Sequence, residues 1–306
     1  MLKHYARALM LNRLFTAGLV IVALLALLAG TAPWLTQSGV LRDPILQYPG
    51  GLDEEGIPQS PGHDHLLGTD HLGRDVLSRV IHGTRVSLTI GTAAMLTATI
   101  IGVSLGLLAG FYGGKVDLAL MRFTEMNLTI PAILLAVAFA GLMDGHVVHL
   151  APASWQWHFL DLELKPGMVS LFLIIGLVAW PGTVRVIRAQ VMGIKERDFI
   201  QAARVLGASN GRLILRHVLP NILPTVIVLA AMSTAGTILL EAGLGYLGIG
   251  VPPPVPTWGS MISEGQRYFV TAPHIVIVPG IAIVLTVLAF NLMAQGLQEV
   301  LDPKQK

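Results

Sequence analysis

Apolar residues gather in six long runs along the chain, and most charged residues fall between these runs. A helix that crosses the hydrocarbon core of a bilayer needs roughly 20 predominantly apolar residues. Each run is long enough for this, so the pattern predicts an all-α polytopic membrane protein with about six transmembrane helices. The predicted spans cover residues 14–35, 86–111, 118–143, 168–187, 219–244 and 273–297.

The third predicted span is the least regular, because Arg122 and Glu125 enter its first turns. Residues three apart on a helix are neighbours on its surface, so these two side chains can pair with each other near the membrane boundary. Pairing reduces the cost of placing them there. The span is therefore retained in the prediction.

A charged, amphipathic segment, residues 195–220, separates the fourth and fifth runs. At helical spacing, one face of it carries Phe199, Ala202, Ala203 and Leu206. Gly207 predicts the end of this helix, and Ser209 or Asn210 can cap a second short helix over 212–218. The pattern predicts a helix–turn–helix in water. From these properties alone, a docking surface and an ordinary solvated loop both remain open.

A second amphipathic segment, residues 67–88, precedes the second run. It reads as a turn followed by a helix in which Val76, Leu77, Val80 and Ile81 share a face. Three basic side chains, those of Arg74, Arg79 and Arg85, are expected to snorkel from that helix to water. On physical grounds the segment is an interfacial lead-in to the second span.

Composition agrees with a lipid environment. The chain has 306 residues, of which 53% are apolar and 12% charged, whereas about 25% of a soluble domain is charged. There is no cysteine, which excludes a disulfide framework and a thiolate metal site. The net charge of +2 is too small to indicate a nucleic-acid partner.

The distribution of basic residues predicts the orientation. With a cytoplasmic N-terminus, fourteen of the 20 lysines and arginines fall on the inside, as the positive-inside rule favours. Both termini and the 195–220 segment are then cytoplasmic, and residues 36–85 lie on the outer, periplasmic or extracellular side. Residues 1–30 could instead be a signal peptide. The apolar run continues to Leu35, which favours a retained first helix.

Several blocks of sequence resemble a known family. The order of Gln201, Ala202, Ala203, Gly207 and Pro220 resembles the EAA loop of bacterial ABC importer permeases, which fits a groove on the ATPase subunit. Gln201 stands where Glu is usual, and His217 stands where Ile is usual. Blocks at 67–88, 121–131, 180–191 and 239–265 are similar to permeases of the dipeptide/oligopeptide importer family, so the resemblance covers about residues 67–300.

The resemblance implies an inner-membrane permease subunit of an ATP-driven importer of di- or oligopeptides. It implies a homologous permease partner, two cytoplasmic ATPase subunits that bind the ATP, and an outer solute-binding protein that delivers peptide to the loop around 252–268. Dipeptides, longer peptides, glutathione and nickel all use similar permeases, so the cargo stays open. The predicted parts are residues 1–35, the outer segment 36–85, the core 86–300 with its coupling loop 188–218, and the tail 301–306.

The resemblance also indicates site residues. The ATPase-coupling set is Arg197, Asp198, Phe199, Gln201, Ala202, Ala203, Leu206 and Gly207. Candidates for the translocation path or its gate are Glu125, Asn127, Glu241 and Trp258. Glu241 and Trp258 are expected to line or support the outer mouth, because glycines and a proline-rich loop lie between them. No catalytic residue and no cofactor are predicted.

Other functions have weaker support from the sequence. Gly243, Gly245 and Gly248 spell GxGxxG without the βαβ context of a dinucleotide site, and no complete P-loop is present, so ATP hydrolysis needs a separate chain. The runner-up is a proton-coupled secondary transporter with Glu125 and Glu241 as its buried carboxylates. A membrane enzyme comes third, without candidate residues. A metal site at His63, His65, His71, Asp64 and Asp70 is possible in principle, but a solvated loop is favoured.

Overall fold

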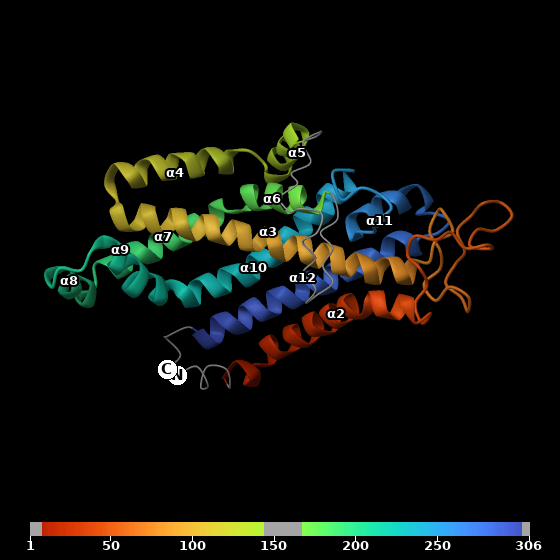
Figure 1. Cartoon of the computed structure of the whole chain (residues 1–306), viewed down its shortest axis with the longest axis horizontal. Helices are drawn as coiled ribbons and strands as arrows, with labels where there is room; N and C mark the ends of the chain where they lie inside the picture. Colours follow the sequence, from red (N-terminus) through yellow and green to blue (C-terminus); the bar gives the residue numbers. More distant parts are fainter. Residues whose placement is uncertain (1–7, 144–166, 302–306) are drawn as a thin grey trace.

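A computed structural model describes residues 8–143 and 167–301, and over these two ranges every regular element is a helix (Figure 1). This confirms the predicted all-α class. The elements are α2 (Arg13–Gln37), α3 (Val76–Tyr112), α4 (Gly114–Thr129), α5 (Ala132–Met143), α6 (Met168–Ala179), α7 (Pro181–Lys195), α8 (Asp198–Val205), α9 (Asn210–Leu213), a π-helical turn (Ile214–Val218), α10 (Leu219–Tyr246), α11 (Trp258–Gly265), a 3-10 turn (Gln266–Tyr268) and α12 (His274–Leu301).

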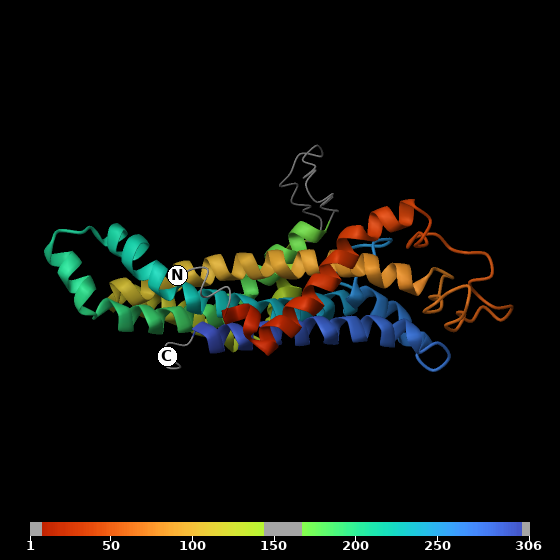
Figure 2. The same ribbon diagram turned by 90° about the horizontal axis from the view of Figure 1, so that it is seen from below.

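The long helices run side by side and give the molecule two distinct ends (Figures 1 and 2). Helix α8 lies at one end, called here the α8 end, and the irregular segment 38–75 lies at the other, called the loop end. Helix α2 packs along α12, and the Asn12 side-chain amide donates to Glu299 at 2.7 Å where the two helices meet. The beginning of α2 and the end of α12 therefore lie together.

Within residues 8–143 and 167–301, four helical segments are long and apolar enough to cross a membrane, and there are up to six spans if each bent pair of helices counts as one. The four are α2, α3, α12 and the continuous segment Asn210–Tyr246. The predicted third and fourth spans are the bent pairs: α4 and α5 meet at 93°, and α6 and α7 at 46°. Counted as one span each, these pairs agree with the six predicted spans, but their bends were not anticipated from the sequence.

Proline explains both bends. Pro131 disfavours helical geometry in the residue before it, and Ile130 is accordingly extended, with φ −92° and ψ 128°. Pro181 opens α7 directly after α6, and its ring nitrogen has no hydrogen to donate to the preceding turn. The two breaks give α4 and α7 directions that differ from those of the apolar helices following and preceding them.

Two predicted boundaries also change. The second span was predicted to begin at residue 86, but α3 begins at Val76 and runs for 37 residues, so the amphipathic lead-in and the span form one helix. Asp75 caps its start by accepting a hydrogen bond from the Ser78 backbone at 2.9 Å. The second short helix, predicted over 212–218, begins at Asn210 and continues through the π-helical turn into α10. Residues 302–306 of the predicted tail lie outside the described part of the chain.

Helix α7 packs closely against a row of glycines on α3. A Cβ added to Gly102 would lie 2.6 Å from the Cβ of Thr183, and one added to Gly106 would lie 2.8 Å from the Cβ of Ile187. Gly110 meets α7 one turn further on, again at 2.8 Å, from the Cβ of Val191. Small residues four apart let membrane helices approach closely. Any larger residue at these positions would force the two helices apart.

Candidate functional site

Helix α8 and the turn after it form the polar helix–turn–helix that the sequence predicts. The helix ends where Gly207 adopts φ +83°, a conformation that side chains with a Cβ rarely take. The backbone N–H of Gly207 bonds to Arg204 and that of Ala208 to Ala203, both at 3.0 Å, which satisfies carbonyls at the helix end. Ser209 occupies the cap of the next helix, without a side-chain hydrogen bond. The predicted stop at Gly207 is confirmed.

The two sides of α8 have different surroundings. Ile200 is fully buried and packs in a cluster with Leu213 and Val218, and Ala203 is half-buried against the same cluster. Ala202 is exposed on the opposite side. The other exposed apolar residues there are Phe199, Val205 and Leu206, which are 40%, 88% and 87% exposed.

The exposed apolar face of α8 therefore differs from the predicted one by one residue: Val205 belongs to it and Ala203 does not. Ala203 belongs to the side that anchors α8 to the chain, together with Ile200. Ala202, with Phe199, Val205 and Leu206, forms what we call the α8 outer face.

Three further coupling candidates lie around this face. Arg197 and Asp198 are exposed at the start of α8. Gln201 is half-buried, and its amide nitrogen donates to the Lys195 carbonyl at 3.2 Å. An amide provides this donor and a glutamate would not. Gln201 thus holds α8 against the end of α7.

Four buried or partly buried charges join the loop end to α11. We call this group the arginine clasp: Asp70, Arg74, Arg79 and Glu264. Arg74 binds Asp70 at 2.6 Å and Glu264 at 2.7 Å, and Arg79 binds the same Glu264 oxygen at 2.9 Å. The two arginine side chains are only 5% and 1% exposed. The prediction that Arg74 and Arg79 snorkel to water was wrong, because both find carboxylate partners inside the protein.

The predicted histidine cluster is divided among separate contacts. His65 binds Asp75 at 2.8 Å, and His71 stacks on Tyr268 with ring centroids 5.8 Å apart. Asp70, His71 and Glu264 bring ligand atoms within 4.8 Å of one another. Both carboxylates of that trio already bind guanidinium groups of the clasp, whose positive charges oppose a further cation. Burial lowers the pKa of the His71 imidazole.

Glu241 and Trp258 lie in the interior of the chain. Trp258 is fully buried between α3, α10 and α12, and its indole N–H donates to the Val80 carbonyl at 3.3 Å. Glu241 is also fully buried, with the Ser87 and Thr257 hydroxyls beside it, although neither carboxylate oxygen has a hydrogen bond of ordinary geometry. Neither side chain lines a surface of this chain. A supporting role at the mouth stays a prediction.

Glu125 and Asn127 lie on α4, where Thr124 is the only residue classed as buried among those described. Glu125 forms the predicted pair with Arg122 at 3.2 Å, and both side chains are mostly exposed. Glu125 is therefore no buried carboxylate of the kind that a proton-coupled carrier requires. Asn127 is half-buried.

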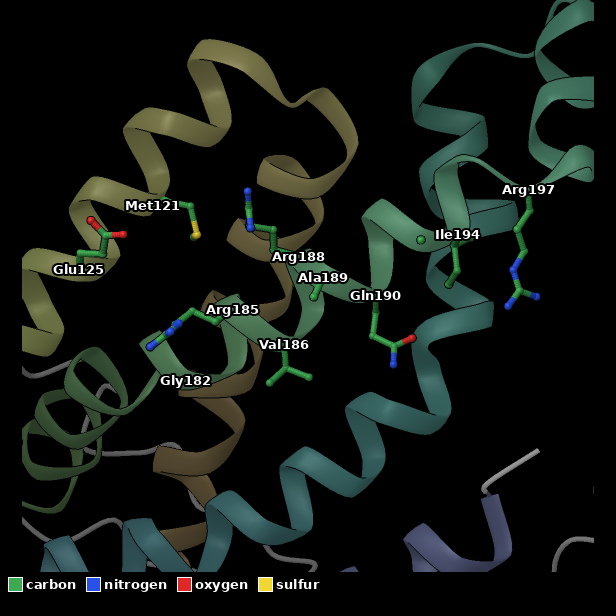
Figure 3. A pocket seen from close by; sticks show the side chains of 11 residues that line it. Met121, Glu125, Gly182, Arg185, Val186, Arg188, Ala189, Gln190, Ile194 and Arg197 are labelled. Atoms are coloured by element: carbon green, nitrogen blue, oxygen red, sulfur yellow. The ribbon is translucent and has the colours of Figure 1, made fainter. Parts of the chain in front are cut away.

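A cavity of about 1090 Å³ lies between α4 and α7 (Figure 3). Glu125 and Met121 line it from α4, and Arg185 and Arg188 line it from α7. Arg188 is held in a two-bond ion pair with Asp117, one bond of which measures 2.6 Å. The sequence analysis did not single out this cavity. The feature of the sequence that could have indicated the cavity is the pair Arg185 and Arg188, one helical turn apart and shortly after Pro181.

The described residues are helical, with several helices apolar enough to cross a membrane and an exposed polar helix–turn–helix at one end, as in a polytopic membrane protein. Residues 102–306 match the family described as the binding-protein-dependent transport system inner membrane component, and the chain belongs to this family.

Individual proteins of similar sequence agree with this family assignment. The di/tripeptide transport system permease DppC of Pseudomonas aeruginosa is 39% identical over 100% of this chain and 93% of its own length. The glutathione transport system permease GsiD of Pectobacterium atrosepticum is 36% identical over 83% of this chain and 78% of its own.

The structure is similar to a chain of the MetNI methionine ABC transporter, with a TM-score of 0.56 and 15% identity over 73% of this chain and 97% of that one. At that identity the likeness concerns the fold alone. Together with the family and the relatives, it identifies this protein as an ABC importer permease. The proton-coupled alternative finds no support in these comparisons.

Proposed function

We propose that this chain is one of two homologous permease subunits that together carry peptides across the inner membrane. Two separate ATPase subunits would bind and hydrolyse the ATP, and a solute-binding protein would deliver the cargo. The names of relatives at 36–39% identity support a peptide or peptide-like cargo. The chain itself lacks a complete P-loop, which agrees with ATP hydrolysis on another subunit.

The observation that carries the proposal is the α8 outer face. Helix α8 lies at the tip of the molecule (Figure 1), and the four apolar residues of the outer face, on this helix or directly after it, are exposed. Exposed Val and Leu side chains gain roughly 1.5–3 kcal/mol each when a partner buries them fully. The opposite side of α8 is fixed to α7 and α9 through Ile200 and Gln201. A force applied to this face would therefore reach α7 directly.

Under this proposal the α8 end is cytoplasmic and the loop end faces outward, with both termini inside. The positive-inside count supports this orientation. The chain has no cysteine, so single cysteines at the exposed positions Ser60 and Ser209 report on one side each. An impermeant thiol reagent applied to intact spheroplasts should label Ser60→Cys and not Ser209→Cys. Labelling of both from outside would refute the orientation.

The cargo is tested with the complete transporter in right-side-out membrane vesicles or in proteoliposomes, with ATP enclosed in the lumen. Uptake of a labelled dipeptide should require ATP and the solute-binding protein, and should persist when the proton gradient is collapsed. Unlabelled tripeptide, glutathione and nickel, added in turn, should identify the preferred class by competition. Uptake that follows the proton gradient and ignores ATP would contradict the proposal.

A further inference from the structure

The cavity between α4 and α7 carries an excess of positive charge. Its charged lining residues are Glu125, Arg185, Arg188 and Arg197. Glu125 is paired with Arg122, and Arg188 is paired with Asp117. Among the residues that the structure describes, no hydrogen bond or ion pair involves the side chain of Arg185 or of Arg197. Two guanidinium groups thus remain unneutralised.

The position of Arg185 makes its charge costly without an anion. Arg185 lies within α7, the second half of a broken apolar pair, whereas Arg197 lies just beyond the end of α7 and is exposed. Under the proposed orientation, the cavity therefore lies toward the cytoplasmic boundary of this span. Arginine within a membrane segment is expensive unless it is paired or solvated. The guanidinium group also matches the geometry of a phosphate better than that of any other common anion except a carboxylate.

Apolar side chains border the same space. Met121, Val186 and Ile194 line the cavity beside the arginines. Elsewhere on α4, the apolar residues Phe123 and Met126 are also exposed. Figure 3 shows the Met121 side chain directed from α4 toward α7 and that of Arg185 extending into the space below Glu125. A ligand with a charged head and an apolar body would contact both kinds of surface.

We infer that this cavity binds an anionic phospholipid of the surrounding bilayer. The phosphate group binds at Arg185, with Arg197 as a second basic contact toward the α8 end, and the acyl chains lie along the exposed side of α4. Basic pockets between membrane helices on the cytoplasmic side are suited to such headgroups. The inference does not depend on which cargo the transporter carries.

The test uses the complete transporter in nanodiscs of phosphatidylcholine that contain a minor fraction of phosphatidylglycerol. After extraction into detergent, native mass spectrometry counts the phosphatidylglycerol molecules retained on each complex. The double variant Arg185→Gln/Arg197→Gln should retain about tenfold less than the wild type, as expected for the loss of charge-assisted hydrogen bonds. Arg185→Lys should retain an intermediate amount, because a lysine still binds phosphate.

The matched control is Arg212→Gln, which removes one positive charge from an exposed position outside the cavity and should leave the lipid count unchanged. Only variants that elute as intact complexes are compared. Equal retention by the double variant and the wild type would overturn the inference, as would no retained phosphatidylglycerol on the wild type. A further arm places Gln190→Cys in the cavity wall: efficient cross-linking to the paired permease would mean that protein fills the cavity, which also refutes lipid binding.

Discussion

Ala202→Asp tests whether α8 docks on an ATPase subunit. Ala202 is exposed in this chain, so the substitution leaves the fold of the permease intact and changes only the α8 outer face. If a partner covers that face, the new carboxylate becomes buried without a counter-charge. An uncompensated buried charge costs about 3–5 kcal/mol, whereas complete burial of Val205 and Leu206 contributes roughly 3–6 kcal/mol to docking. The one substitution thus offsets most of the apolar gain.

A loss of about 3 kcal/mol weakens binding by more than a hundredfold. Affinity-purified Ala202→Asp permease should therefore carry few or no ATPase subunits, and ATP-dependent uptake into vesicles should be lost. Ala202→Ser, which is small and uncharged, and Arg212→Gln, on the next helix, should keep both. The half-buried Ala203 is a poorer probe, because an aspartate there would also disturb the cluster around Ile200. Normal ATPase recovery and normal transport by Ala202→Asp would refute the docking argument.

Three further predictions follow from the geometry. Gly207→Val should reduce ATPase recovery because a β-branched residue resists φ +83°, whereas Gly207→Asn should largely preserve it, since Asn tolerates this conformation. Glu264→Gln should lower the stability of the purified protein by about 2 kcal/mol, a smaller loss than for a fully buried ion pair because Glu264 is 24% exposed. Glu125→Gln removes an exposed ion pair and should lower the stability by under about 1 kcal/mol. Equal melting temperatures of these two variants would contradict this ranking. Burial lowers the pKa of His71 below its ordinary value of 6.5, so the unfolded chain binds a proton at this residue more readily than the folded chain does. The stability of the folded protein should therefore decline as the pH falls below 6.5, and this decline should be smaller in His71→Gln.

The sequence was sufficient to predict the structure wherever a local signal determines the backbone conformation. The first span, predicted over 14–35, appears as α2 over Arg13–Gln37, because an uninterrupted apolar run has few alternatives in lipid. The helix stop at Gly207 follows from the one residue type that adopts a positive φ without strain. The pairing of Arg122 with Glu125 depends on residues three apart on a helix. Each of these depends only on residues that are close together or contiguous in the sequence.

The sequence-based predictions differ from the structure where residues distant in the sequence, or a competing local signal, determine the conformation. Arg79 was expected in water, but its partner Glu264 is 185 residues away in the sequence, and helical periodicity carries no information about such a contact. The bend within the third span was not anticipated, because the restriction of Ile130 by Pro131 outweighs the continuity of the apolar run. Helical periodicity and the resemblance to the EAA loop both placed Ala203 on the docking face, and its coupling role stays a prediction, but the structure shows the side chain half-buried. The neighbouring cluster around Ile200, formed partly by α9 and α10, turns it inward.

The length of α3 has a mechanical consequence. At 37 residues it spans about 55 Å, well beyond the roughly 30 Å hydrocarbon core. One end enters the loop end, where Arg79 is fastened to Glu264 of α11. Toward the other end, its glycine row leaves α7 no room to slide independently. We therefore expect α3 to move as one rigid body. A displacement of α8 that is transmitted through α7 would rotate α3 as a whole. The loop end would then move together with the α8 end, without a series of side-chain rearrangements between them.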